Sequence, residues 1–216
     1  MERHDLLLFG ATRNTGLRLA EQARARGERV AAMARPGSAT SPLLALGVTV
    51  VEGDAFNLAD CEKAIRETAP RRIVSVLGGR NPQGRRVDAE GNINVIRALE
   101  GKAGVERFVL MTSMGSGEQY ADVPASTRIF LGEALLAKTE AENFLKDTRL
   151  PWSIVRPGGL SNDPAAGDFI LSERADRLHG AYLSRADVAA ATLAVLDSER
   201  WLHRAVTIQR RTKVEN

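Results

Sequence analysis

The chain has 216 residues, of which 44% are hydrophobic, and a formal net charge of +3. This length fits one domain with its own core, and basic residues scattered among acidic ones predict a solvated surface and no nucleic-acid partner. The lone cysteine, Cys61, excludes an internal disulfide and a cysteine zinc site, and the three histidines are too far apart in sequence to suggest a metal site. Without an apolar run of about 20 residues or a signal-peptide pattern, we expect a cytoplasmic protein with no membrane partner.

Strand and helix patterns alternate along the whole chain. The apolar patterns and the Gly and Pro positions predict strands at 5–9, 29–34, 48–52, 72–77, 107–112, 152–156 and 205–209, and helices at 15–26, 41–46, 58–68, 87–102, 128–147 and 185–198. This alternation predicts an α/β fold, a Rossmann-type doubly wound parallel sheet in a single domain over 1–216, with strand order 3-2-1-4-5-6 plus an edge strand. Residues 157–184, with a weak helical pattern around 170–178, are too long for a simple connection, so we expect them to form a small C-terminal cap over the cleft. Cys61 falls in a predicted amphipathic helix, which indicates a packed thiol and not a nucleophile.

The stretch GATRNTG, from Gly10 to Gly16, follows the first predicted strand. Gly10 would allow a tight turn, and Gly16 would allow close packing of the following helix against the strand. The N-terminus of that helix would offer free N–H groups and a partial positive charge to a pyrophosphate. The alternative is a purely structural turn, but the repeated strand–helix pattern favours a dinucleotide site. The remaining turn residues assigned to that site are Thr12, Arg13, Asn14 and Thr15.

The cofactor choice is predicted from the end of the second strand. An enzyme that binds NAD usually has an acidic residue there for the ribose diol, whereas this chain has VAAMARPGS, with Arg35 at the tip. Arg35, with Arg13 in the neighbouring turn, would hold the 2′-phosphate of NADP(H), at about 1.5–3 kcal/mol for each charge-assisted contact. The alternative is that both are surface arginines. Asp54 is predicted to accept a hydrogen bond from the adenine amino group, or else to cap the next helix.

Six segments together resemble a known family. They are GATRNTG, GDAFN at 53–57, RFVLMTSMGSG at 107–117, AKTEAENFL at 137–145, WSIVRPGGL at 152–160 and LSRADVAA at 183–190. Over nearly the whole chain they resemble the atypical short-chain dehydrogenase/reductases, in particular the NAD(P)H-binding, NmrA-like branch that includes biliverdin reductase B-type flavin reductases. That family usually has GATGxxG, so Arg13 is a departure.

The resemblance also implies the other end of the site. Ser113 matches the family's active-site serine, and Lys138 matches the lysine of a Tyr-x-x-x-Lys pair and would hold the nicotinamide ribose; Ser113 could instead cap a strand end, and Lys138 could be an exposed helix lysine. Ala134 stands where the tyrosine would be. The further residues assigned to the cofactor site are Ala55, Leu77, Gly78 and Thr112 at strand ends, and Pro157, Gly158 and Gly159, which resemble the segment bordering the nicotinamide.

The missing tyrosine directs the functional prediction. Reduction of a ketone needs a proton at the developing alkoxide, and a placed acid contributes about 10²–10⁴-fold. We therefore predict an NADPH-dependent oxidoreductase that transfers hydride to a flavin, a quinone or a similar conjugated small-molecule acceptor. The second hypothesis is a non-catalytic, NADP(H)-sensing regulatory protein of the NmrA-like type, and the third is an NAD(P)-dependent epimerase or dehydratase. Both a monomer and a homodimer are compatible with the sequence.

Overall fold

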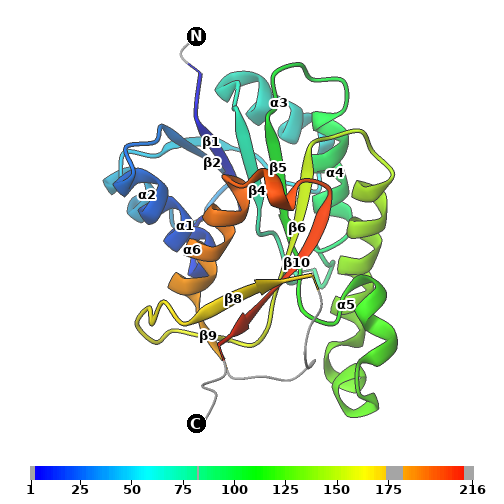
Figure 1. Ribbon diagram of the computed structural model, residues 1–216. Helices are drawn as coiled ribbons and strands as arrows, with labels where there is room; N and C mark the ends of the chain where they lie inside the picture. The colour runs from blue at the N-terminus through cyan, green and yellow to red at the C-terminus, as the bar shows by residue number, and fades with distance from the viewer. Residues whose placement is uncertain (1–2, 82, 174–181, 212–216) are drawn as a thin grey trace.

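A computed structural model describes residues 3–81, 83–173 and 182–211. Eight strands form one sheet in the order β3-β2-β1-β4-β5-β6-β10-β8, in which every neighbouring pair is parallel except the antiparallel pair of β10 and β8 (Figure 1). The strands are β1 (Leu6–Phe9), β2 (Val30–Ala34), β3 (Thr49–Glu52), β4 (Arg72–Ser75), β5 (Arg107–Met111), β6 (Trp152–Pro157), β8 (Phe169–Ser172) and β10 (Arg204–Arg210). The predicted Rossmann-type α/β fold is confirmed.

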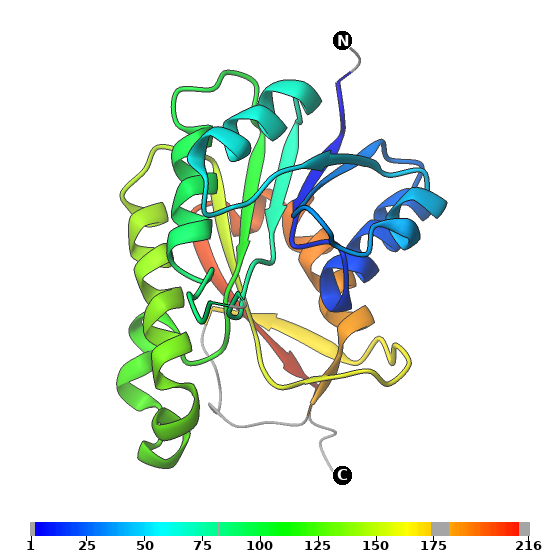
Figure 2. The ribbon, with the colours of Figure 1, turned by 180° about the vertical axis from the view of Figure 1, so that it is seen from behind.

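Helices cover both faces of the sheet. One face carries α1 (Asn14–Ala25), α2 (Ser41–Ala45) and α6 (Arg185–Leu196), and the other carries α3 (Leu58–Thr68), α4 (Glu90–Leu99) and α5 (Ala125–Lys146), which lie in front in Figure 2. Smaller elements are the 3₁₀ turns η1 (Gly117–Asp122) and η2 (Glu199–Trp201), and a two-stranded sheet of β7 (Leu160–Ser161) and β9 (Leu183–Ser184).

The sequence of β1 explains why both faces are covered. Its four residues are all apolar and buried, and successive side chains of a strand point to opposite faces. Leu6 and Leu8 pack in the layer of α1 and α6, while Leu7 and Phe9 pack in the layer of α3, α4 and α5. A strand of this kind is stable only when helices exclude water from both sides.

The predicted order of the first six strands is correct, and the prediction for the end of the sheet is wrong in part. The strand predicted at 205–209 does not form the edge: β10 pairs with β6, and the edge strand is β8. Residues 170–172, for which the sequence indicated a weak helix, belong to β8, and 174–178 lie outside the described residues. The strand β8 forms because its backbone pairs with β10, where Ile170 faces Gln209. A segment of four residues is too short to show a periodic pattern, so this pairing could not be predicted from its sequence.

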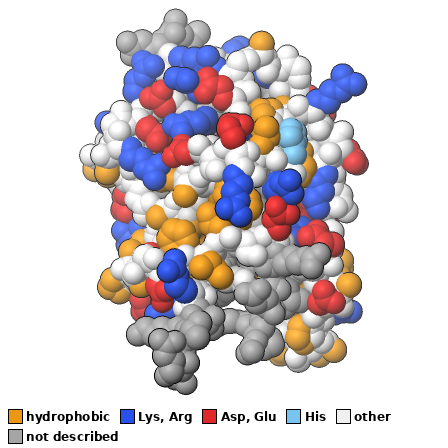
Figure 3. Space-filling model, viewed as in Figure 1, with side chains coloured by type: hydrophobic (Ala, Val, Ile, Leu, Met, Phe, Trp, Pro, Cys, Tyr) orange, Lys and Arg blue, Asp and Glu red, His pale blue; other side chains and the backbone are white. Residues whose placement is uncertain are grey.

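Several charged side chains on the surface form pairs of opposite sign. On the face seen in Figure 3, basic and acidic side chains intermingle. Arg72, for example, contacts Glu28 at 2.9 Å and Asp197 at 2.5 Å. In the described part of the chain, no helix is long and apolar enough to cross a membrane, and no cluster of His, Cys, Asp or Glu could hold a metal ion.

Cys61 lies inside α3 and is fully buried. Burial raises the pKa of its thiol to about 12, with smaller contributions from the carboxylates of Asp60 and Asp54. The prediction of a packed thiol is confirmed.

Candidate nucleotide-binding site

The glycine turn between β1 and α1 has the geometry that its sequence predicts. Gly10 has a φ of +88°, a conformation that favours glycine, and its carbonyl oxygen lies only 2.2 Å from where a Cβ atom on residue 16 would be. Any side chain at position 16 would therefore push α1 away from β1. With glycine there, the N-terminus of α1 lies at the carboxyl end of the strand.

Arg13 fits into this turn without strain. Its backbone is extended, with φ −159° and ψ 172°, so a third glycine is not needed at this position. The unusual conformation falls on the next residue, Asn14, which begins α1 with a φ of +53°. Asparagine adopts the left-handed region more readily than most residues. The turn therefore tolerates a large cation at the position where the resembled family has glycine.

A cavity of about 380 Å³ opens at the carboxyl ends of the parallel strands. It lies where the strand order reverses between β1 and β4, which is the usual ligand position in such sheets. The predicted site residues that line it are Gly10, Thr12, Arg13, Asn14, Thr15, Gly16, Arg35, Asp54, Ala55, Leu77, Gly78, Thr112, Ser113, Lys138, Pro157 and Gly158.

Gly159 is the predicted site residue that the structure does not bring to the cavity. It is absent from the cavity lining, and its carbonyl oxygen accepts a hydrogen bond from the backbone N–H of Leu183 at 2.8 Å. A Cβ atom at Gly159 would lie 3.1 Å from the ring of Tyr182. The second glycine of the Pro-Gly-Gly turn therefore packs against Tyr182 instead of facing the cavity.

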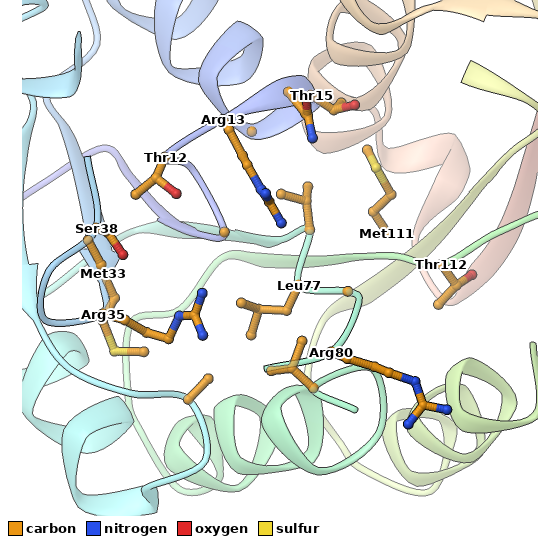
Figure 4. A pocket seen from close by; sticks show the side chains of 18 of the residues that line it. Thr12, Arg13, Thr15, Met33, Arg35, Ser38, Leu77, Arg80, Met111 and Thr112 are labelled. Carbon is orange, nitrogen blue, oxygen red and sulfur yellow. The ribbon is translucent and has the colours of Figure 1, made fainter. Parts of the chain in front are cut away.

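Two arginines reach into the cavity from neighbouring elements. Figure 4 shows the side chains of Arg13, from the start of α1, and Arg35, from the end of β2, both directed into the cavity. Within residues 3–81, 83–173 and 182–211, neither guanidinium has an ion pair with a carboxylate. Ser38, which was not predicted, also lines the cavity; its backbone N–H donates to the carbonyl of Arg35 at 3.0 Å and closes the turn after β2.

Thr15 adds an unsatisfied polar group at the same place. Thr15 is only 4% exposed, and its Oγ1 atom has no hydrogen-bond partner among the described residues. Buried hydroxyls are normally paired, so this one is suited to an oxygen atom of a ligand. Together with the free N–H groups of the α1 N-terminus and the two arginines, Thr15 fits the phosphates of a dinucleotide.

Asp54 lines the cavity just beyond β3. Its Oδ1 accepts a hydrogen bond from the backbone N–H of Phe56 at 3.0 Å. The alternative role as the cap of α3 is wrong, because Asn57 caps that helix by accepting from the backbone N–H of Ala59 at 3.0 Å.

Lys138 lies at the other side of the cavity and is not an exposed helix lysine. Its side chain is 16% exposed, and its Nζ contacts Oδ1 of Asp88 at 2.6 Å. Ser113 follows the end of β5 and also lines the cavity. Asp88 was not identified from the sequence, because its partner lies 50 positions further along the chain.

No tyrosine reaches this cavity. The chain contains two, Tyr120 and Tyr182, and both belong to the described residues but neither lines the cavity. Tyr120 packs its ring against the guanidinium of Arg128, and Tyr182 is 66% exposed. Ala134 lies one helical turn before Lys138 on α5, so this position supplies no phenol either.

A buried ion cluster supports the wall formed by β5 and β6. Arg156 is fully buried and donates to Glu142 at 2.5 and 3.0 Å and to Glu118 at 2.5 and 2.8 Å. The hydroxyl of Thr112 donates to Glu142 at 2.6 Å, so this hydroxyl is bonded within the protein. The hydrogen bonds from Arg156 hold the pKa of Glu118 at about 2. In the sequence, an arginine among the apolar residues of WSIVRP indicates a carboxylate partner for Arg156, because a buried charge must be paired.

Two further arginines line the cavity without having been predicted. Arg80 follows β4, pairs with Glu133 and donates to the carbonyl of Gly84 at 2.5 Å. Arg185 begins α6 and donates to Oδ1 of Asn162 at 2.9 Å. Arg80 lies in a loop without a strand or helix period, and Arg185 is the first residue of a predicted helix, whose pattern does not indicate where that side chain points.

Comparison with known proteins identifies the family. A model of the family described as NAD(P)H-binding matches residues 10–199. The chain belongs to this NAD(P)H-binding family. The glycine turn, the cavity and the reversal of strand order all lie inside the matched region, which agrees with a nicotinamide dinucleotide as the cofactor. It also agrees with the resemblance to atypical short-chain dehydrogenase/reductases.

Three relatives show how far the similarity extends. The structure of ChuY, an anaerobillin reductase from Escherichia coli O157:H7, superposes with a TM-score of 0.85 at 31% identity and covers 95% of this chain and 97% of that one. An uncharacterized chloroplastic protein of Arabidopsis thaliana is 31% identical over 96% of this chain and 77% of its own length. Sanguinarine reductase of Eschscholzia californica is 32% identical over 55% of this chain, which corresponds to 43% of its own length.

Proposed function

We propose that this protein is an NADPH-dependent reductase that transfers hydride to a conjugated small-molecule acceptor such as a flavin, a quinone or an open-chain tetrapyrrole. The observation that carries the proposal is a cavity lined by Arg13 after β1 and Arg35 after β2, neither of them ion-paired among the described residues, and by no described tyrosine. The similarity to two named reductases supports the same reaction class.

The residues divide into two groups along the cavity. Arg13 and Arg35 would bind the 2′-phosphate of the adenosine ribose, each at about 1.5–3 kcal/mol. Thr15 and the N-terminus of α1 would bind the pyrophosphate. Lys138 would hold the nicotinamide ribose. Bound in this orientation, the nicotinamide would supply the hydride.

The acceptor would lie between the nicotinamide and the residues that follow β5 and β6. Ser113 would orient it through a hydrogen bond, and Pro157 and Gly158 would form the wall beside it. Because no tyrosine lines the cavity, the proton would come from water. Conjugated acceptors suit such a site, since they spread the charge that arrives with the hydride, whereas a simple ketone needs a placed acid.

The test measures NADPH oxidation, by loss of its absorbance, with FMN, a quinone, a bilin and a simple ketone as acceptors. We expect turnover with at least one conjugated acceptor, none with the ketone, and a lower rate in the Ser113→Ala variant. Oxidation of NADPH by the ketone alone would contradict the proposal, and so would the absence of turnover with every acceptor.

The absence of turnover combined with tight NADPH binding would favour the second candidate, a non-catalytic protein that senses NADP(H). The observation in its favour is the same cavity without a tyrosine. The epimerase or dehydratase hypothesis has less support, because the missing tyrosine argues against it.

A further inference from the structure

Asp88 is a buried carboxylate in the turn before α4. Its side chain is only 2% exposed, and it contacts three donors: Nζ of Lys138 at 2.6 Å, the backbone N–H of Gly79 at 2.9 Å and Nη1 of Arg86 at 3.5 Å. Carboxylates are rarely this buried unless they are paired. Asp88 is not in the cavity lining, so any effect it has on a ligand passes through its neighbours.

The ion pair of Asp88 and Lys138 lies at the cavity wall, with Lys138 in the lining and Asp88 behind it. A Cβ atom on Gly78 would lie 3.2 Å from Oδ1 of Asp88 and 3.2 Å from Nζ of Lys138. Gly78 and Lys138 both line the cavity. The pair therefore fixes two neighbouring parts of the wall, the ammonium from α5 and the backbone that follows β4.

Asp88 is itself held from the end of β4. The side-chain amide of Asn92 donates to the carbonyl of Asp88 at 2.8 Å and to that of Leu77 at 3.3 Å. The hydroxyl of Ser75 donates to Oδ1 of Asn92 at 2.5 Å. Because Ser75 is the last residue of β4, the position of the Asp88 carboxylate is tied to the sheet and not to a free loop.

The chemistry of the ammonium group explains why this matters. A lysine side chain carries three N–H donors and about 2 kcal/mol of rotamer entropy. Asp88 uses one donor and fixes the direction of the side chain, which leaves two donors for the hydroxyls of a ligand. Binding then does not have to order the lysine, and this preorganisation improves affinity.

We propose that Asp88 is the positioning residue that orients the Lys138 ammonium group for the nicotinamide ribose. The proposal rests on the proposed function in placing that ribose, and not the adenosine ribose, beside Lys138. It goes beyond that function because it gives Asp88, which does not line the cavity, a role in the affinity for the nicotinamide half of the cofactor.

The test compares the affinities for the whole cofactor and for its adenosine half. Calorimetry gives Kd for NADPH and for adenosine 2′,5′-bisphosphate in the wild type and in Asp88→Asn, Lys138→Gln and the double variant. If the wild type binds NADH more tightly than NADPH, the same comparison is made with NADH and ADP. We expect each single variant to bind NADPH about tenfold more weakly than the wild type does, and to bind adenosine 2′,5′-bisphosphate less than twofold more weakly. We expect the double variant to be no weaker than Lys138→Gln alone.

A matched control is Glu90→Gln, which removes an exposed carboxylate two residues further along that pairs with Arg85. It should leave both affinities unchanged. If Asp88→Asn lowered the affinity for both ligands equally, Asp88 would have only a structural role. If the affinity losses of the two single variants added up in the double variant, the two residues would act independently. If Asp88→Asn does not fold, Lys138→Gln decides, and wild-type affinity for the whole cofactor in that variant would overturn the proposal. These are binding measurements, so they stand whether or not any acceptor is reduced.

Discussion

The carbonyl oxygen of Gly10 lies 2.2 Å from the place that a Cβ atom on Gly16 would occupy. This contact sets how closely α1 approaches the end of β1, and hence where the free N–H groups of the helix point. The same turn accepts Arg13 in an extended conformation. Close packing and a basic side chain are therefore compatible at adjacent positions of one turn.

The Gly16→Ala substitution should move α1 away from β1. We expect a loss of cofactor affinity of at least tenfold and a lower unfolding temperature, because overpacking of a tight contact costs about 1–3 kcal/mol. Calorimetry with NADPH and thermal unfolding measure the two effects. The control is Gly132→Ala in α5, where the new Cβ would lie 3.3 Å from the flexible end of Tyr120 and outside the cavity. Wild-type affinity in Gly16→Ala would show that this contact does not control the site.

Cys61 should be inert in the folded protein. Burial raises the pKa of its thiol to about 12, and alkylating reagents react with the thiolate. At pH 8 we expect iodoacetamide to label the denatured chain readily and the native chain only at the rate of unfolding. Mass spectrometry before and after addition of urea measures this difference. Rapid labelling of the native protein would contradict the burial of the thiol.

Stability at acid pH should depend on Glu118. Hydrogen bonds from Arg156 hold its pKa at about 2 in the folded chain, below the ordinary value of 4.5. A depressed carboxyl pKa stabilises the native state above the unfolded pKa, and this contribution is lost as the pH falls from about 4.5 towards 2. Glu118→Gln should therefore unfold at a lower temperature than the wild type at pH 6, and the difference should shrink towards pH 2.

The exposed Glu140 on the same helix as Glu142 provides the comparison for that measurement. Glu140→Gln should change the unfolding temperature little at either pH. A difference between Glu118→Gln and the wild type that persists undiminished at pH 2 would mean that the stabilisation does not come from the Glu118 carboxylate.

The sequence was sufficient for those parts of the fold that depend on local patterns. Four consecutive apolar residues in β1 predicted a strand covered on both faces, and the glycines of the following turn predicted the position of α1. The edge strand β8 was missed, because it is specified by pairing with β10 some 40 residues away and not by its own composition.

The candidate site divides in the same way. Arg13 and Arg35 could be predicted because they flank strand ends at fixed positions of the fold. Asp88 could not, because its partner Lys138 lies on α5, which the sequence does not place beside it. Arg156 among apolar residues indicated a buried partner, but the sequence does not identify Glu142 as that partner. Gly159 was assigned from the resemblance alone, and the structure packs it against Tyr182 instead.

We propose that the preference of the site for NADPH comes from Arg13 and Arg35. The most direct test is the ratio of the Kd values for NADH and NADPH, measured by calorimetry in the wild type and in an Arg13→Ala/Arg35→Ala double variant. Arg66→Ala, which removes an exposed arginine of α3 that does not line the cavity, controls for the loss of a surface arginine outside the site. We predict that the wild type and Arg66→Ala bind NADPH roughly 10- to 100-fold more tightly than NADH, and that the double variant loses this preference while it keeps its affinity for NADH. Equal affinities in the wild type, or a preference that survives in the double variant, would contradict the claim.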